Sequence, residues 1–304
     1  MTVLDEDIAV KIQELKKKRR AVILVHNYQP PEIHQIADFV GDSLELSRLA
    51  AQTPAEVIVF CGVHFMAETA SILSPQKKVL LPASDAGCPM ADMVTPDRLQ
   101  SLKEELPGYA VVTYVNSSAA VKAFSDICCT SANAVKVVSS LENDDILFIP
   151  DQHLGRFVQS KTGKNIHLWP GYCPVHASIT SAHIQACKNK YPGAKVIAHP
   201  ECKTEVLTLA DDILSTGGMV KYCRQLTAGE IIVATDAGML YRLKNENPAV
   251  TFIPANANAK CKNMQRTNLD NVLGSLQEMS GEVKVADDIR SQAYRAVERM
   301  IQLG

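Results

Sequence analysis

One sequence pattern occurs three times along this chain of 304 residues. Each copy opens on a short aliphatic run, which ends on the polar residues His26, Asn116 and His199. A hydroxyl residue follows in each copy, with successive spacings of 88 and 85 residues: Ser43, Ser131 and Thr216. Each copy then reaches a cysteine, with spacings of 85 and 88 residues: Cys88, Cys173 and Cys261. A repeat of this length is too long for a solenoid unit and long enough for a small domain.

Within each copy, unbroken β-branched and aliphatic runs alternate with amphipathic segments. The expected strands are 22–25, 57–60, 79–81, 111–115, 146–149, 166–168, 196–198, 231–234 and 250–253. Such runs are typical of parallel strands buried on both faces, and the alternation favours right-handed crossovers. We therefore expect an α/β protein built from three tandem three-layer α/β/α domains with parallel sheets.

The expected domains cover residues 1–109 with an N-terminal helix, 110–193, and 194–304 with a C-terminal helix. Residues 97–106, 181–190 and 268–278 are amphipathic and predict helices. Residues 287–303 predict a long helix that caps the third domain. If the three domains pack with pseudo-threefold symmetry, their three cysteines meet around one central site.

Composition excludes several kinds of partner. The net charge is −2, which gives no electrostatic basis for binding nucleic acid or a membrane surface. No segment has the roughly 18 unbroken apolar residues of a membrane span, and the acidic start is unlike a signal peptide. We expect a cytoplasmic protein. Nine cysteines then favour metal binding or catalysis over disulfides.

The three repeated cysteines are the candidate metal ligands. Cys88 and Cys173 each precede a proline, which fixes the following backbone. Three converging thiolates suit either an iron–sulfur cluster or a zinc ion, in both cases with one open position. Five other cysteines lie in apolar contexts and are interpreted as buried small side chains: Cys61, Cys128, Cys129, Cys187 and Cys223. Cys202, beside His199 and Glu201, is compatible with either role.

The repeated hydroxyl residues predict an anion site. Ser43, Ser131 and Thr216 are placed where a helix N-cap is expected. Together with Gly41, Gly217 and Gly218 they would offer helix N-termini to a phosphate or a dicarboxylate.

Acid–base candidates also fall at the predicted strand ends, where parallel α/β sheets place their ligand sites. They are His26, Tyr28, His176, His199 and Glu201, with Tyr114 and Asn116 beside them. Of these, we assign proton transfer to Tyr28, His199 and Glu201.

Several motifs in the chain resemble the quinolinate synthase family, the A protein of bacterial and archaeal NAD biosynthesis. They include HNYQPPEIHQIADFVGDSLELSRLA, GCPMADMVTP, VTYVNSSAAVKAFSDICCTSANAVKVV, LGRFV, GYCPVH, VIAHPEC, STGGM and KCKNM. The similarity runs in order over residues 20–300. One departure is that Cys261 stands alone, whereas some relatives place this cysteine in a segment containing CxxC.

The resemblance implies a specific reaction and cofactor. Such proteins condense iminosuccinate with dihydroxyacetone phosphate, with loss of phosphate and water, and close the ring of quinolinate. A [4Fe–4S] cluster with one open iron would be held by Cys88, Cys173 and Cys261. An enzyme that supplies iminosuccinate would be a functional partner. The implied substrate-contacting residues are His26, Ser43, Tyr114, Val115, Asn116, Ser131, His199, Pro200, Glu201 and Thr216, with Tyr28 and His176 also lining the pocket.

Two other functions use the same cysteines. A zinc-dependent hydro-lyase or aldolase would be colourless after anaerobic purification. An iron–sulfur sensor or electron carrier would need a fourth ligand or a docking face, and the sequence offers neither clearly.

Overall fold

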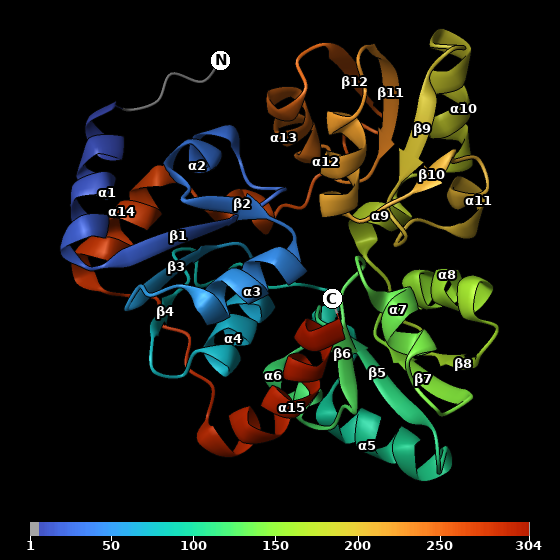
Figure 1. Ribbon diagram of the computed structural model, residues 1–304, viewed down its shortest axis with the longest axis horizontal. Coiled ribbons are helices and arrows are strands. Elements are labelled where there is room, and N and C mark those ends of the chain that lie inside the picture. Colours follow the sequence, from blue (N-terminus) through green and yellow to red (C-terminus); the bar gives the residue numbers. More distant parts are fainter. Residues whose placement is uncertain (1–5, 304) are drawn as a thin grey trace.

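Three separate four-stranded parallel sheets form the framework of the molecule (Figure 1). The computed structural model describes residues 6–303. The first sheet contains β1 (Ala21–His26), β2 (Phe39–Gly41), β3 (Val57–Cys61) and β4 (Lys78–Leu80). The second contains β5 (Ala110–Tyr114), β6 (Ile127–Cys129), β7 (Asp145–Ile149) and β8 (Asn165–Leu168). The third contains β9 (Lys195–Ala198), β10 (Asp212–Ile213), β11 (Gly229–Ala234) and β12 (Val250–Pro254).

The three sheets share one strand order, in which the first strand lies between the second and the third, and the fourth forms an edge. All nine expected strands are present, and the α/β class with parallel sheets is confirmed. The sequence prediction missed β2, β6 and β10, which have only two or three residues each. Pseudo-threefold symmetry between the units stays a prediction.

Helices connect and cover these strands. In the first two units they are α1 (Glu6–Lys18), α2 (Pro31–Ile36), α3 (Ser43–Gln52), α4 (His64–Leu73), α5 (Pro96–Glu105), α6 (Ala119–Ala123), α7 (Ala134–Ser139) and α8 (Gln152–Thr162). The remainder are α9 (Pro174–Ala177), α10 (Ser181–Lys190), α11 (Thr204–Leu207), α12 (Thr216–Arg224), α13 (Met239–Glu246), α14 (Leu269–Glu278) and α15 (Asp287–Leu303). Short 3-10 turns cover Ala91–Met93 and Met264–Arg266.

An aspartate joins the first and second strands of every sheet. The carboxylate of Asp38 accepts the N–H of Ile23 at 2.8 Å, while the N–H of Asp38 donates to the carbonyl of Ile23 at 3.0 Å. The same two bonds link Asp126 to Val111 and Asp211 to Val196. Hydrogen bonds to a charged group contribute about 1.5–3 kcal/mol each. They therefore set the register of a second strand that is too short to define its own.

This register aligns the three repeats residue by residue. Leu24 pairs with Phe39, Val112 with Ile127 and Ile197 with Asp212. The residues ending the first strands therefore correspond as His26, Tyr114 and His199, and those two positions later as Tyr28, Asn116 and Glu201. Matching Asn116 with His26 and His199 was wrong by two residues, because Tyr114 resembles a strand interior in sequence.

The helix before each sheet packs on that sheet. Ile12 of α1 lies in the core of the first sheet, Leu99 of α5 in that of the second, and Ile184 of α10 in that of the third. The predicted boundaries at 109/110 and 193/194 divide α5 and α10 from the sheets they cover. As limits of the sequence repeat, those boundaries stay a prediction. In the structure, the second and third packing units each begin with the helix that precedes the predicted boundary.

The C-terminal helices return to the earlier units. Val272 and Leu276 of α14 are buried in the first core beside Ile12, and Figure 1 shows α14 alongside α1. Helix α15 packs against α6, β6 and α4, and the carbonyl of Met300 accepts a hydrogen bond from Asn133. The expectation that 287–303 caps the third unit was wrong, since its apolar face is buried on the second and first units. This segment ties the three units together.

Two further expectations concern export and membranes. Among residues 6–303, no helix is both long and apolar enough to cross a bilayer. The first five residues, part of the acidic start used to predict the absence of an export signal, lie outside the described residues.

Candidate functional site between the three units

Two adjoining cavities lie at the carboxyl ends of the strands. The larger, of about 490 Å³, is lined by all three repeated cysteines, Cys88, Cys173 and Cys261. The smaller, of about 50 Å³, is lined by residues from all three sheets, including His26, Ser43, Tyr114, Ser131, His199 and Thr216. Tyr28, Asn116, Glu201 and Met264 line both cavities and form the wall between them. The fold thus places the thiols directly beside the polar pocket.

The three repeated cysteines share one local environment. Each lies in the loop after the fourth strand of its sheet and before a short helical turn. Burial raises the pKa of Cys88 to about 12, while hydrogen bonds from the backbone N–H groups of Ala91 and Met90 act in the opposite direction. The N–H of His176 acts likewise on Cys173, and those of Met264 and Asn263 on Cys261. Such N–H groups stabilise a thiolate once a metal replaces its proton.

The other cysteines differ. Cys61, Cys128, Cys129 and Cys223 are buried among apolar side chains, as expected, and Cys187 is partly exposed beside the third core. Cys202, left undecided by the sequence, is fully buried, and its thiol donates to the carbonyl of Ala234 at 3.3 Å. None of these six lines either cavity.

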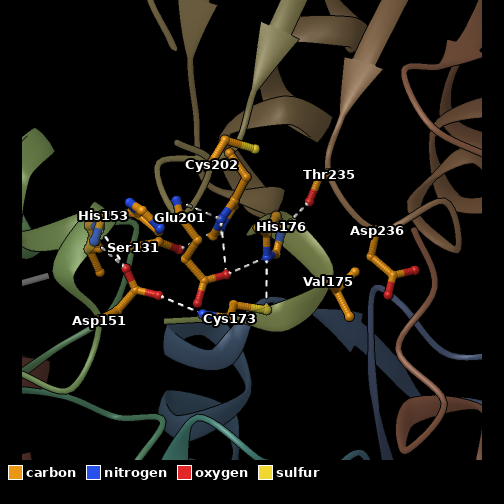
Figure 2. A network of polar contacts seen from close by, with 12 residues as sticks. Ser131, Asp151, His153, Cys173, Val175, His176, Glu201, Cys202, Thr235 and Asp236 are labelled. Atoms are coloured by element: carbon orange, nitrogen blue, oxygen red, sulfur yellow. Dashed lines mark hydrogen bonds and ion pairs between the residues drawn. The ribbon is translucent and has the colours of Figure 1, made fainter. Parts of the chain in front are cut away.

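Glu201 is the centre of a buried polar network, shown with dashed lines in Figure 2. Its Oε2 lies 2.9 Å from Nδ1 of His176 and 3.2 Å from Nδ1 of His199. On the far side of these rings, Nε2 of His176 lies 2.8 Å from the Thr235 hydroxyl, and Nε2 of His199 lies 3.1 Å from the Ser131 hydroxyl. The Tyr28 hydroxyl is 2.6 Å from that of Thr235. A continuous chain of hydrogen bonds therefore runs from Tyr28 to Ser131 through Glu201.

The charges in this network follow from burial and pairing. Burial by itself would raise the pKa of Glu201, but the charge and hydrogen bonds of His176 and His199 lower it well below its usual range. Burial lowers the pKa of His199, and it lowers that of His26 to about 3. Burial and the charge of Glu201 raise the pKa of Tyr28. The pocket at neutral pH therefore holds the Glu201 carboxylate, a neutral imidazole at His26 and the protonated phenol of Tyr28.

Two buried oxygens of the shared wall are unpaired. Oε1 of Glu201 and Oδ1 of Asn116 have no hydrogen-bond partner in the part of the chain that the structure describes. An unpaired buried acceptor costs about 1–3 kcal/mol. Both atoms are thus available to hydrogen-bond donors of a ligand.

The repeated hydroxyl residues line the smaller cavity, but they do not cap helices as expected. The side chains of Asp42 and Ser215 cap α3 and α12, so Ser43 and Thr216 are the first helical residues. Ser131 precedes α7, whose N-cap is Asn133. The hydroxyls of Ser43 and Thr216, freed from capping by their neighbours, and that of Ser131, which contacts His199, therefore lie at the pocket wall.

Two expected contact residues lie behind the wall. Val115 and Pro200 are buried and line neither cavity, and the N–H of Val115 donates to the carbonyl of Cys129 at 2.9 Å. Sequence reasoning missed Thr235, Asp236 and Asp151, polar residues that follow the third strands of their sheets. The sequence signal that could have identified them is their position directly after a predicted buried strand.

A second set of metal-ligating atoms exists at the same place. Cys173, His176 and Glu201 offer ligand atoms within 4.8 Å of one another. These atoms already contact each other, since Nδ1 of His176 lies 3.2 Å from Sγ of Cys173 as well as beside Glu201. These three side chains therefore form a hydrogen-bond network that needs no metal ion to hold it together.

Fold and site together define an α/β protein of three repeated units that enclose one composite site at their strand ends. A family model described as "Quinolinate synthetase A protein" matches residues 10–302. The chain belongs to this family.

Curated relatives agree along the full length. The chain is 59% identical over 298 residues to a quinolinate synthase of Dehalococcoides mccartyi, covering 98% of this chain and 99% of the relative. It is 54% identical to a quinolinate synthase of Geobacter metallireducens, covering 98% of each. It is 52% identical to quinolinate synthase 2 of Methanosarcina acetivorans, covering 98% of this chain and 96% of the relative. The resemblance inferred from the motifs is confirmed.

Proposed function

We propose that this protein is a quinolinate synthase of NAD biosynthesis. It is a transferase that joins iminosuccinate to dihydroxyacetone phosphate and forms quinolinate with loss of phosphate and water. The observation that carries the proposal, beside the family match, is the wall shared by the two cavities. Two of its four residues, Tyr28 and Glu201, belong to the buried acid–base network, and the wall separates the cavity of the three thiols from the polar pocket.

The larger cavity fits a [4Fe–4S] cluster held by Cys88, Cys173 and Cys261. These thiols line one cavity, receive backbone N–H bonds, and come from three loops at equivalent places in the fold. Three ligands leave one iron open, and the bound cluster then supplies a Lewis acid that polarises an oxygen of the substrate.

The smaller cavity is proposed to bind the substrates. The hydroxyls of Ser43, Ser131 and Thr216, with the N-termini of α3 and α12, offer donors to phosphate or carboxylate oxygens. His26, Tyr114 and Asn116 complete the contacts, His176 is proposed to reach the substrate from the larger cavity, and Val115 and Pro200 support the wall from behind. A volume of about 50 Å³ is too small for a triose phosphate, so the lining side chains must move apart as substrate enters.

Proton transfer is assigned to Tyr28, His199 and Glu201. Glu201 is ionised and Tyr28 is protonated, the forms that a proton acceptor and a proton donor require, and binding of substrate must bring both pKa values closer to neutral before they exchange protons with it. His199 lies between the Glu201 carboxylate and the Ser131 hydroxyl, so it can pass protons between them along this chain of hydrogen bonds. Enclosure between three units keeps water away from the reactive imine.

The substrate also defines the surroundings of the enzyme. Because iminosuccinate hydrolyses readily in water, an enzyme that produces it must act in the same compartment. We place that compartment in the cytoplasm, where free cysteines persist.

The experiment is anaerobic reconstitution with iron and sulfide, followed by assays for bound iron, absorption near 400 nm and quinolinate formation. Cys88→Ala, Cys173→Ala and Cys261→Ala should each lose the cluster and the activity. Cys202→Ala, a buried cysteine outside the cavity, should keep both. A colourless, zinc-loaded wild-type protein would instead support a hydro-lyase or aldolase, and a coloured protein without turnover would support a sensor.

A further inference from the structure

The three cysteine loops are attached to their sheets by one hydrogen bond that recurs in every repeat. The N–H groups of His64, Gln152 and Ala237 donate to the carbonyls of Ala86, Gly171 and Ala259, at 2.8, 2.9 and 2.8 Å. Each accepting carbonyl lies two residues before a repeated cysteine. The loops after the third strands and the cysteine loops therefore correspond position by position.

In two of the repeats a carboxylate adds a second attachment. Oδ2 of Asp151 accepts the backbone N–H of Cys173 at 3.2 Å, and Oδ2 of Asp236 accepts that of Cys261 at 2.6 Å. The other oxygen, Oδ1, accepts the N–H groups of His153 and Leu154 in one case and of Gly238 in the other. Figure 2 shows the bond from Asp151 to Cys173.

The first repeat lacks this attachment. The position that matches Asp151 and Asp236 is Val63, whose side chain carries no acceptor. All three side chains are buried, with exposed fractions of 3% for Val63, 0% for Asp151 and 1% for Asp236. The first cysteine, Cys88, is thus held by its loop backbone alone.

Electrostatics oppose the placement of these carboxylates. A carboxylate beside a cysteine disfavours the thiolate that a metal requires, because the two negative charges repel each other. A buried anion beside a ligand of anionic character is costly unless its geometry compensates. The backbone N–H groups that each carboxylate accepts offset part of this cost, and they fix the direction of the cysteine backbone.

We propose that Asp151 and Asp236 are positioning residues that hold the Cys173 and Cys261 loops in the conformation that binds the cluster. Each aspartate joins the helix that follows the third strand to the N–H of the ligand residue, so the thiol direction is set before metal arrives. This inference rests on the proposed cluster ligands. Loss of a hydrogen-bonded residue behind a metal ligand lowers metal affinity by about 10–100-fold in other proteins.

The test uses Asp151→Ser and Asp236→Asn in the anaerobically reconstituted protein. Serine remains a good N-cap for α8 but is too short to reach the Cys173 N–H, which separates helix capping from the attachment of the cysteine. Asparagine keeps the shape of the aspartate, but its amide nitrogen is a donor, so only its oxygen can accept a backbone N–H. Asp126→Asn is the matched control, because Asp126 also accepts a backbone N–H but lies at the opposite end of its strand.

Iron and sulfide per chain, the absorption near 400 nm, and its decay rate in air are measured alongside unfolding of the metal-free form. The two test variants should bind the cluster about 10–100-fold more weakly than wild type, seen as less iron and sulfide per chain and a faster decay, while their metal-free forms unfold like the Asp126→Asn control. Decay rates equal to that of the control would overturn the proposal. So would metal-free variants that no longer fold, since the aspartates would then be purely structural. If wild type itself takes up no iron, the proposed function fails instead.

Discussion

Oε2 of Glu201 and Nδ1 of His176 lie 2.9 Å apart, and both side chains are almost completely buried. Glu201 follows β9 of the third sheet, whereas His176 lies on α9, which follows the second sheet. The contact therefore joins the segment that follows the second sheet to the loop after the first strand of the third. It couples the acid–base pocket to Cys173, whose sulfur lies 3.2 Å from the same imidazole nitrogen.

Replacing the carboxylate should stop proton transfer. We expect Glu201→Gln to lower kcat by about 10²–10⁴-fold, because an amide cannot take up a proton at neutral pH. The measurement is steady-state quinolinate formation, with iron content determined on the same sample. Turnover near wild type with the cluster intact would show that Glu201 is not the proton acceptor.

Thr235 should matter through its hydroxyl. Thr235→Val keeps the shape of the side chain but removes the hydrogen bonds to Tyr28 and His176, each of which contributes about 0.5–1.5 kcal/mol, so we expect a loss of about tenfold in kcat. Thr235→Ser retains the hydroxyl and is the control, which should restore most of the rate. Equal rates for the valine and serine variants would exclude a role for this link.

Acidification should destabilise the metal-free protein through His26. Its pKa is lowered to about 3 in the fold, chiefly by burial, against about 6.5 in the unfolded chain. Between these values the unfolded chain binds one more proton, so the free energy of unfolding falls as the pH is lowered. The contribution is up to about 1.4 kcal/mol per pH unit.

Urea unfolding of wild type and His26→Gln between pH 7 and 4 checks this. As the pH is lowered, the free energy of unfolding of the variant should fall less steeply than that of wild type, by up to about 1.4 kcal/mol per pH unit. Parallel curves for the two proteins would mean that His26 is protonated in the folded state as well.

Two helical glycines should respond in opposite directions to alanine. A Cβ on Gly155 in α8 would contact Leu168 and lie 2.9 Å from Cδ1 of Phe148, so Gly155→Ala should destabilise the fold by about 1–3 kcal/mol. A Cβ on Gly274 in α14 meets nothing within 4 Å. Gly274→Ala should stabilise by about 0.5–1 kcal/mol, because alanine loses less backbone entropy in a helix. Chemical denaturation of both variants measures the difference, and changes of the same sign would contradict the packing described for α8.

Local sequence patterns were sufficient for much of this structure. The long aliphatic strands, the repeat and the three loop cysteines could be predicted because their signals lie within one strand or recur at a fixed spacing. Strands as short as β10 could not, since their register depends on Asp211 reaching a backbone N–H fifteen residues earlier in the chain.

Relationships between units depended on assembly. The sequence by itself determined that polar side chains and thiols end the strands of three α/β repeats, because alternation of buried runs and helices is a local property. Only the tertiary structure decided that α15 packs on the first two units and that His176 faces Glu201. Each of these depends on which buried surfaces meet, and contacts between residues far apart along the chain leave no periodic signal in it.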